Sequence, residues 1–167
     1  MADEHAGQGG FTAATGHAPG PAGGAGARRA EVAVAYEGLL QIRRLTGTGP
    51  GDPAAAPAPW ERARPVRAVA LLLEAADLPP SAVDARGART AAGYAVREGE
   101  RPGTAVVEWL GPPGSGAALA EEDALRRCAG VLARHGWEAL LYRGPRRRRR
   151  LEVEPADAGP AVRGPAS

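Results

Sequence analysis

The sequence of 167 residues has no lysine and no asparagine, and its only cysteine is Cys128. A single cysteine excludes an intrachain disulfide and a metal site built from cysteines, and it is typical of a protein of a reducing compartment. The absence of lysine excludes the phosphate-binding Walker motif, which ends in a lysine and a serine or threonine. We therefore interpret the glycine-rich segment 111–116 as a connector.

Long apolar runs are also missing. No run approaches the roughly 20 residues that a membrane-spanning helix needs, and residues 1–26 lack the basic and apolar blocks of a signal peptide. These features predict a soluble, cytoplasmic protein without a membrane partner. His5 and His17 alone do not make a metal site, so the sequence predicts no metal and no cofactor.

Glycine and proline, in contrast, are abundant, with 24 and 16 residues. They gather at both ends of the chain and in one internal segment, where little apolar surface is available to offset the entropy of ordering. We therefore expect disordered tails at 1–26 and 155–167. An extended, mobile linker is expected at 46–59.

The densest apolar pattern lies between Ala117 and Gly136. The residues Leu125, Cys128 and Leu132 form a stripe on one face of a helix. Acidic residues lie in its first turns, where a negative charge interacts favourably with the helix dipole. Gly136 follows at the position where a residue in the left-handed conformation usually ends a helix. The pattern predicts a central helix, with Cys128 as a small core residue.

Two pairs of short strands flank this helix. Gly93–Arg97 and Thr104–Leu110 are joined by turn-forming residues, and residues 137–142 and 151–154 are separated by Gly144-Pro145. We expect two hairpins that form a four-stranded, largely antiparallel sheet covered by the central helix. The fold class is therefore α+β, with a domain that spans residues 60–154.

One or two further helices are expected before this sheet. Residues 27–45 have helical periodicity, so they predict a helix that is either isolated or docked on the domain or a partner. A second helix is expected between Trp60 and Leu78. Ser81 suits the start of a short helical turn that reaches Ala85.

The five-arginine run Arg146–Arg150 is the sharpest functional signal. Between Glu61 and Glu154 arginines outnumber acidic residues by 16 to 13, but without the run the count is 11 to 13. The excess of positive charge in the domain therefore comes from one loop. Because the planar guanidinium donates paired hydrogen bonds to phosphate, we expect contacts with nucleic-acid phosphates. The expected contact residues are Arg143, Arg146, Arg147, Arg148, Arg149 and Arg150.

Several alternatives remain open at this stage. The run is also compatible with a solvated turn in an arginine-biased protein, since all 21 basic residues are arginine. It could also bind an acidic protein surface. A separate alternative is a protein–protein interaction adaptor that uses the first helix or a sheet edge and has no nucleic-acid role. Residues 64–110 could form a winged helix that binds DNA. An enzyme with a dispersed site is also possible, although no catalytic motif is found. No aromatic residue lies within the run, so base stacking is not expected there.

The layout of Ala91–Glu154 combines a Gly-Tyr strand, a Pro-Gly hairpin, an Arg-Cys-Ala helix and a Gly-Trp strand. It resembles small uncharacterised proteins of GC-rich bacterial genomes, whose codon usage also favours arginine. The resemblance implies a bacterial setting and no activity. The sequence thus predicts a small non-enzymatic accessory or regulatory module.

Overall fold

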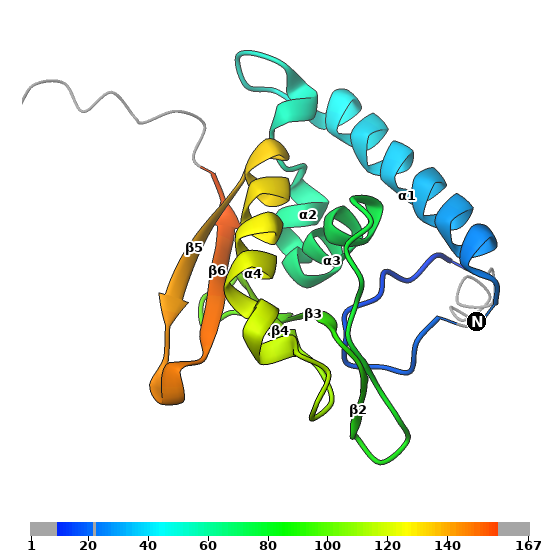
Figure 1. The fold of residues 1–167 in the computed structure, drawn as a ribbon. Helices are drawn as coiled ribbons and strands as arrows, with labels where there is room; N and C mark the ends of the chain where they lie inside the picture. Colours follow the sequence, from blue (N-terminus) through cyan, green and yellow to red (C-terminus); the bar gives the residue numbers. More distant parts are fainter. Residues whose placement is uncertain (1–9, 22, 157–167) are drawn as a thin grey trace, which may run out of the picture.

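The computed structural model describes residues 10–21 and 23–156, and it has the α+β fold that the sequence predicts (Figure 1). Its main sheet has four antiparallel strands in the order β3-β4-β6-β5. The strand bounds are β3 Gly93–Glu98, β4 Ala105–Leu110, β5 Trp137–Arg143 and β6 Arg149–Pro155. Each predicted hairpin strand is present, and β6 begins two residues earlier than expected.

The central helix α4 (Ala117–Arg134) covers one face of this sheet, as predicted. The side chains of Leu125, Cys128 and Leu132 are all 0% exposed. They pack with inward-facing sheet residues such as Leu151, because alternate residues of a strand point to opposite faces. After the helix, Gly136 adopts φ 80°, the left-handed conformation expected of a residue that ends a helix.

Two further helices stand where the sequence predicts one. The helices α2 (Pro59–Ala63) and α3 (Pro65–Ala75) are separated at Arg64. Pro65 is the first residue of α3, a position where proline loses no helical hydrogen bond. Val69, Leu72 and Leu73 are fully buried, so α3 belongs to the core.

The predicted helix at 27–45 is α1 (Ala25–Thr46), and it docks on the domain beside α3. Val32 and Leu39 are buried there. The more unusual contact is a buried ion pair in which Arg43 donates from Nε and Nη2 to Glu61, both at 2.7 Å. Both side chains are 0% exposed.

Residues 46–59 are packed on the domain, which differs from the mobile linker expected from composition. They include the short 3-10 helix η2 (Pro53–Ala55). Arg43 donates to the carbonyl oxygen of Ala54 at 3.0 Å, and Pro57 and Ala58 are buried. The buried guanidinium needs an additional acceptor, and the segment supplies one.

Residues 10–21 also differ from expectation, since they lie against the sheet although the sequence predicts a disordered tail over 1–26. Ala13 is only 4% exposed. The Val96 amide donates to the Thr15 carbonyl at 2.7 Å, and Tyr94 Oη donates to the Ala14 carbonyl at 2.9 Å. These backbone groups find partners far away in the sequence, which local composition does not reveal. Of the other residues of the predicted tails, 25–26 begin α1 and Pro155 ends β6, whereas 1–9 with His5, 22 and 157–167 lie outside the described residues.

The predicted helical turn from Ser81 to Ala85 is wrong. The segment forms β1 (Ala82–Val83), which pairs with β2 (Arg89–Ala91) in a small second sheet. The Asp84 carboxylate accepts hydrogen bonds from the amides of Arg86 and Ala88 and so shapes a turn. A winged helix would need a recognition helix at this place, and the structure has a hairpin instead.

Candidate functional site

The arginine run lies at the tip of the hairpin formed by β5 and β6, where it is divided between turn and strand. The turn is closed by a hydrogen bond from the Gly144 amide to the Arg148 carbonyl at 2.6 Å. It contains the short 3-10 helix η3 (Pro145–Arg147). Three arginines therefore lie in the turn, whereas Arg149 and Arg150 are the first two residues of β6.

Two arginines of the turn have an unusual backbone conformation. Arg146 and Arg147 have φ angles of 60° and 63°, in the left-handed region. This conformation costs a residue with a β-carbon about 1–2 kcal/mol. Glycine would avoid that cost, so this turn carries its arginines at some expense of stability.

Arg149 faces the helix side of the sheet, where it joins the hairpin tip to the start of α4. Its amide donates to Glu121 Oε1 at 2.8 Å. Its guanidinium lies 3.6 Å from Glu121 and 3.4 Å from Glu122. A hydrogen bond from Arg126 and the charge of Arg149 lower the pKa of Glu122. Arg149 therefore fixes the position of the tip.

Arg150 points to the opposite, open face of the sheet. It donates to Glu152 Oε1 from Nη2 at 3.0 Å and from Nε at 3.3 Å. Its Cζ atom lies 5.9 Å from the ring centroid of Tyr142, the residue opposite it in β5. Sequence reasoning missed this neighbour because Tyr142 lies outside the run and reaches it only through the hairpin register.

The other four arginines are exposed: Arg143, Arg146, Arg147 and Arg148. Within residues 10–21 and 23–156, none of the four has a carboxylate within ion-pair distance. Their guanidinium groups are therefore able to bind an anion without first breaking an ion pair in that part of the chain. Of the six predicted contact residues, these four are available and two are engaged within the fold.

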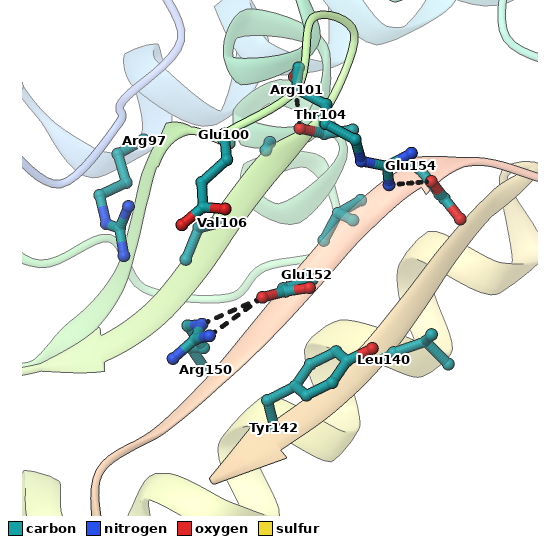
Figure 2. A pocket seen from close by; sticks show the side chains of 13 residues that line it. Arg97, Glu100, Arg101, Thr104, Val106, Leu140, Tyr142, Arg150, Glu152 and Glu154 are labelled. Atoms are coloured by element: carbon teal, nitrogen blue, oxygen red, sulfur yellow. Dashed lines mark hydrogen bonds and ion pairs between the residues drawn. The ribbon is translucent and has the colours of Figure 1, made fainter. Parts of the chain in front are cut away.

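The open face of the sheet has a different electrostatic character (Figure 2). It contains a shallow depression of about 330 Å³ beside Leu140 and Tyr142. Arg101 is 2.7 Å from Glu154, and Arg97 is 3.0 Å from Glu108. With the pair of Arg150 and Glu152, the charges of this face largely compensate one another. The depression therefore offers less attraction for an anion than the hairpin tip does.

Cys128, Ser81 and His135, three residues with catalytic potential, are held in contacts within the fold. Cys128 is fully buried, and burial raises the pKa of its thiol to about 12, which disfavours the reactive thiolate. Ser81 is buried and donates to the Ala91 carbonyl at 2.8 Å. His135 follows the end of α4 and has Tyr36 Oη at 2.8 Å from its Nε2 atom. These contacts join elements of the fold.

Among the described residues, no cluster of three His, Cys, Asp or Glu side chains is arranged to hold a metal ion. His17, considered above as a ligand, has Nδ1 3.2 Å from Arg89 Nη2. Burial and the Arg89 charge lower its pKa. Of the helices in the described part of the chain, none combines the length and apolar character needed to cross a bilayer.

Comparison of the chain with protein-family models, with curated proteins and with solved structures finds no match.

Proposed function

We propose that this chain is a small, non-enzymatic accessory or regulatory module that contacts nucleic-acid phosphates through its hairpin tip. We define the tip as Arg143, Arg146, Arg147 and Arg148. The proposal also places the module in the cytoplasm of a bacterium.

The observation that carries the proposal is the concentration of exposed guanidinium groups on a short, fixed turn. Two strands and the Arg149 contacts with α4 hold the turn in place. Less conformational entropy is then lost on binding than with a disordered arginine tail. Each guanidinium can donate two hydrogen bonds to a phosphate.

The tip has no deep pocket and no recognition helix, so it suits the backbone of a nucleic acid better than base edges. Contacts to phosphate position a protein on the duplex without reading sequence. We therefore expect similar affinity for duplexes of different sequence. Neutralising about four phosphates should make binding strongly dependent on salt, because each contact releases counterions.

The test is a fluorescence-anisotropy titration of labelled duplex DNA and RNA at 50 mM salt. The variant Arg146→Ser/Arg147→Ser/Arg148→Ser removes three of the four tip charges. A matched variant, Arg64→Ser/Arg127→Ser/Arg134→Ser, removes three exposed arginines from the helical side of the molecule.

We expect the tip variant to lose at least tenfold in affinity and the matched variant to change much less. Equal losses in the two variants would show that only net charge matters, and the proposal would be wrong. Absence of binding by the wild-type chain would also reject it. An acidic protein partner would then be the better explanation of the tip.

A further inference from the structure

The two edges of the main sheet differ in how their backbone groups are satisfied. At the β3 edge the Tyr94 amide donates to Pro79 at 2.9 Å, and the Ser81 amide donates to Tyr94 at 2.8 Å. Thr15 accepts from the Val96 amide in the same row. At the β5 edge, no backbone partner is found among the described residues. Figure 1 shows β5 at the outside of the sheet, beyond β6.

The hydrogen-bond phase of β5 defines which groups point outward. The Ala156 amide donates to the Gly136 carbonyl, and the Gly144 amide donates to the Arg148 carbonyl. Gly136 and Gly144, the partners on the β5 side, both have even numbers. In an antiparallel strand the backbone groups of successive residues point alternately toward one neighbouring strand and away from it. The backbone groups of the even-numbered residues of β5 therefore bond to β6. The amides and carbonyls that point away from β6 are those of Trp137, Ala139, Leu141 and Arg143.

The side chains of β5 also favour pairing over protection. Leu140, Leu141 and Tyr142 are 45%, 36% and 42% exposed and follow one another along this strand. Natural edge strands are usually protected by proline, bulges or charged side chains. Strand β5 has no proline, its two charged residues, Glu138 and Arg143, lie near its ends, and its seven-residue register with β6 is regular.

We propose that β5 pairs antiparallel with β5 of a second copy of this chain, with Leu140 opposite Leu140 at the two-fold axis. In this register outward-pointing residues meet each other, so all four contribute hydrogen bonds. An isologous interface also requires that one patch be complementary to itself.

The strand meets that requirement in this register. Glu138 lies opposite Tyr142 of the second copy, where a carboxylate can accept from the phenol. Trp137 lies opposite Arg143, and because the Trp137 ring is only 1% exposed within its own copy, this pair contributes backbone hydrogen bonds alone. The small Ala139 lies opposite Leu141. No like charges face each other across the axis.

Two neighbouring registers also place outward-pointing residues opposite each other, but each of them leaves part of β5 without a strand partner. Centring the pair on Ala139 places Arg143 opposite His135, beyond the start of the strand. Centring it on Leu141 places Glu138 opposite Gly144, beyond the strand end. Only the register centred on Leu140 uses all seven residues of β5.

The paired copies would share one continuous sheet, with the two arginine tips at opposite ends. The strand rise of about 3.3 Å per residue places each tip roughly 17 Å from the axis. The tips are then about 34 Å apart, close to the repeat of a DNA duplex of roughly 34 Å. This spacing has meaning only if the proposed function holds, whereas the pairing itself does not depend on it.

Sedimentation equilibrium of the full chain, without nucleic acid, tests the pairing. The expected mass is twice the 17.0 kDa of one chain. Leu140→Lys places two cations together at the axis and should give the monomer mass. Leu119→Lys is the matched control, because Leu119 is 93% exposed on α4, and it should leave the dimer intact.

Mixing Leu140→Lys with Leu140→Glu should restore the dimer mass, which also shows that both variants fold. A wild-type monomer across the micromolar to millimolar range would overturn the proposal. A dimer that persists in Leu140→Lys would do the same.

The register has its own test in disulfide trapping. Residues opposite each other at a non-hydrogen-bonded position have α-carbons about 4.5 Å apart, which suits a disulfide. Leu140→Cys should therefore form a covalent dimer on oxidation, while Leu119→Cys should not. The native Cys128 is buried and gives no background. Equal trapping at the two positions would contradict the register.

The dimer and the tip can fail separately. Leu140→Lys should still bind duplex DNA, with a salt slope about half that of the wild-type chain because it presents one tip. A dimer without affinity for nucleic acid would reject the proposed function and leave the pairing intact.

Discussion

The buried pair of Arg43 and Glu61 allows a quantitative test of how α1 and residues 46–59 are held. Glu61 accepts three hydrogen bonds of 2.7 Å, two from Arg43 and one from the Ala58 amide. The variant Glu61→Gln removes the negative charge and leaves the guanidinium fully buried. Breaking a buried pair in this way costs about 3–5 kcal/mol of unfolding free energy.

A loss of this size is large, because domains are typically stable by about 5–15 kcal/mol. With a urea dependence of about 2 kcal/mol per molar, the unfolding midpoint should fall by roughly 2 M. The matched control is Glu154→Gln, which breaks the pair with Arg101. The side chains of that pair are 74% and 38% exposed, so its loss should cost less than about 1 kcal/mol.

Urea denaturation followed by circular dichroism measures both variants. The double variant Arg43→Met/Glu61→Leu should recover only part of the loss: an apolar pair of similar volume replaces a buried ion pair at little cost, but the buried Ala58 amide loses its acceptor, which costs about 1–3 kcal/mol. If Glu61→Gln costs no more than Glu154→Gln, the pair is not buried in solution. The docking of α1 described above would then be wrong.

Three further predictions concern the turn, the buried thiol and the sheet edge. Arg147→Gly should raise the unfolding free energy by about 0.5 kcal/mol, because relief of the left-handed conformation exceeds the entropy cost of glycine. A lower unfolding free energy in urea would show that the turn is not strained. The affinity of the same variant for nucleic acid should fall. Because the folded pKa of Cys128 is raised to about 12, its stabilising contribution is present below the unfolded pKa of about 8.5 and is lost above it. Stability measured by thermal melts should therefore fall between pH 8.5 and 10, and Cys128→Ala should weaken that dependence; an equal dependence in the variant would assign it to other groups. Gly16→Val puts a β-carbon against the Tyr94 carbonyl oxygen and Ala95 of β3. It should displace residues 10–21 and increase amide exchange at Val96, whereas unchanged protection would show that these residues do not bond to the sheet.

Much of the fold could be predicted because its signals are local. The stripe of Leu125, Cys128 and Leu132 defines the buried face of α4 within two helical turns. Gly136 and Gly144-Pro145 mark ends that depend only on neighbouring residues. The two hairpins predict which strands pair within each hairpin, but they do not predict that β4 pairs with β6 in the centre of the sheet.

Residues 10–21 and 46–59 could not be assigned in the same way. These two segments are held by hydrogen bonds to other elements of the fold, such as those from the Val96 amide to Thr15 and from Arg43 to Ala54. A composition rich in glycine, alanine and proline gives no indication of these partners. Composition therefore underestimated how much of the chain packs on the domain.

The candidate site was predicted as a set of residues but not as an arrangement. Successive strand residues point to opposite faces, so the first residue of β6 decides where each arginine goes. Arg149 thereby reaches Glu121 and Glu122, while Arg150 reaches Glu152 and the ring of Tyr142. The sequence alone did not fix that register, and it could not separate the exposed tip from these two engaged residues.

The central claim is that the exposed arginines of the tip bind phosphate, and the salt dependence of duplex binding measures this directly. The slope of log K against log salt is about −0.9 for each phosphate neutralised on B-DNA. Replacing Arg146, Arg147 and Arg148 by serine should therefore make the slope less steep by at least about 2.7, while the matched Arg64, Arg127 and Arg134 variant keeps the wild-type slope. The account is contradicted if the tip variant and the wild-type chain have the same slope.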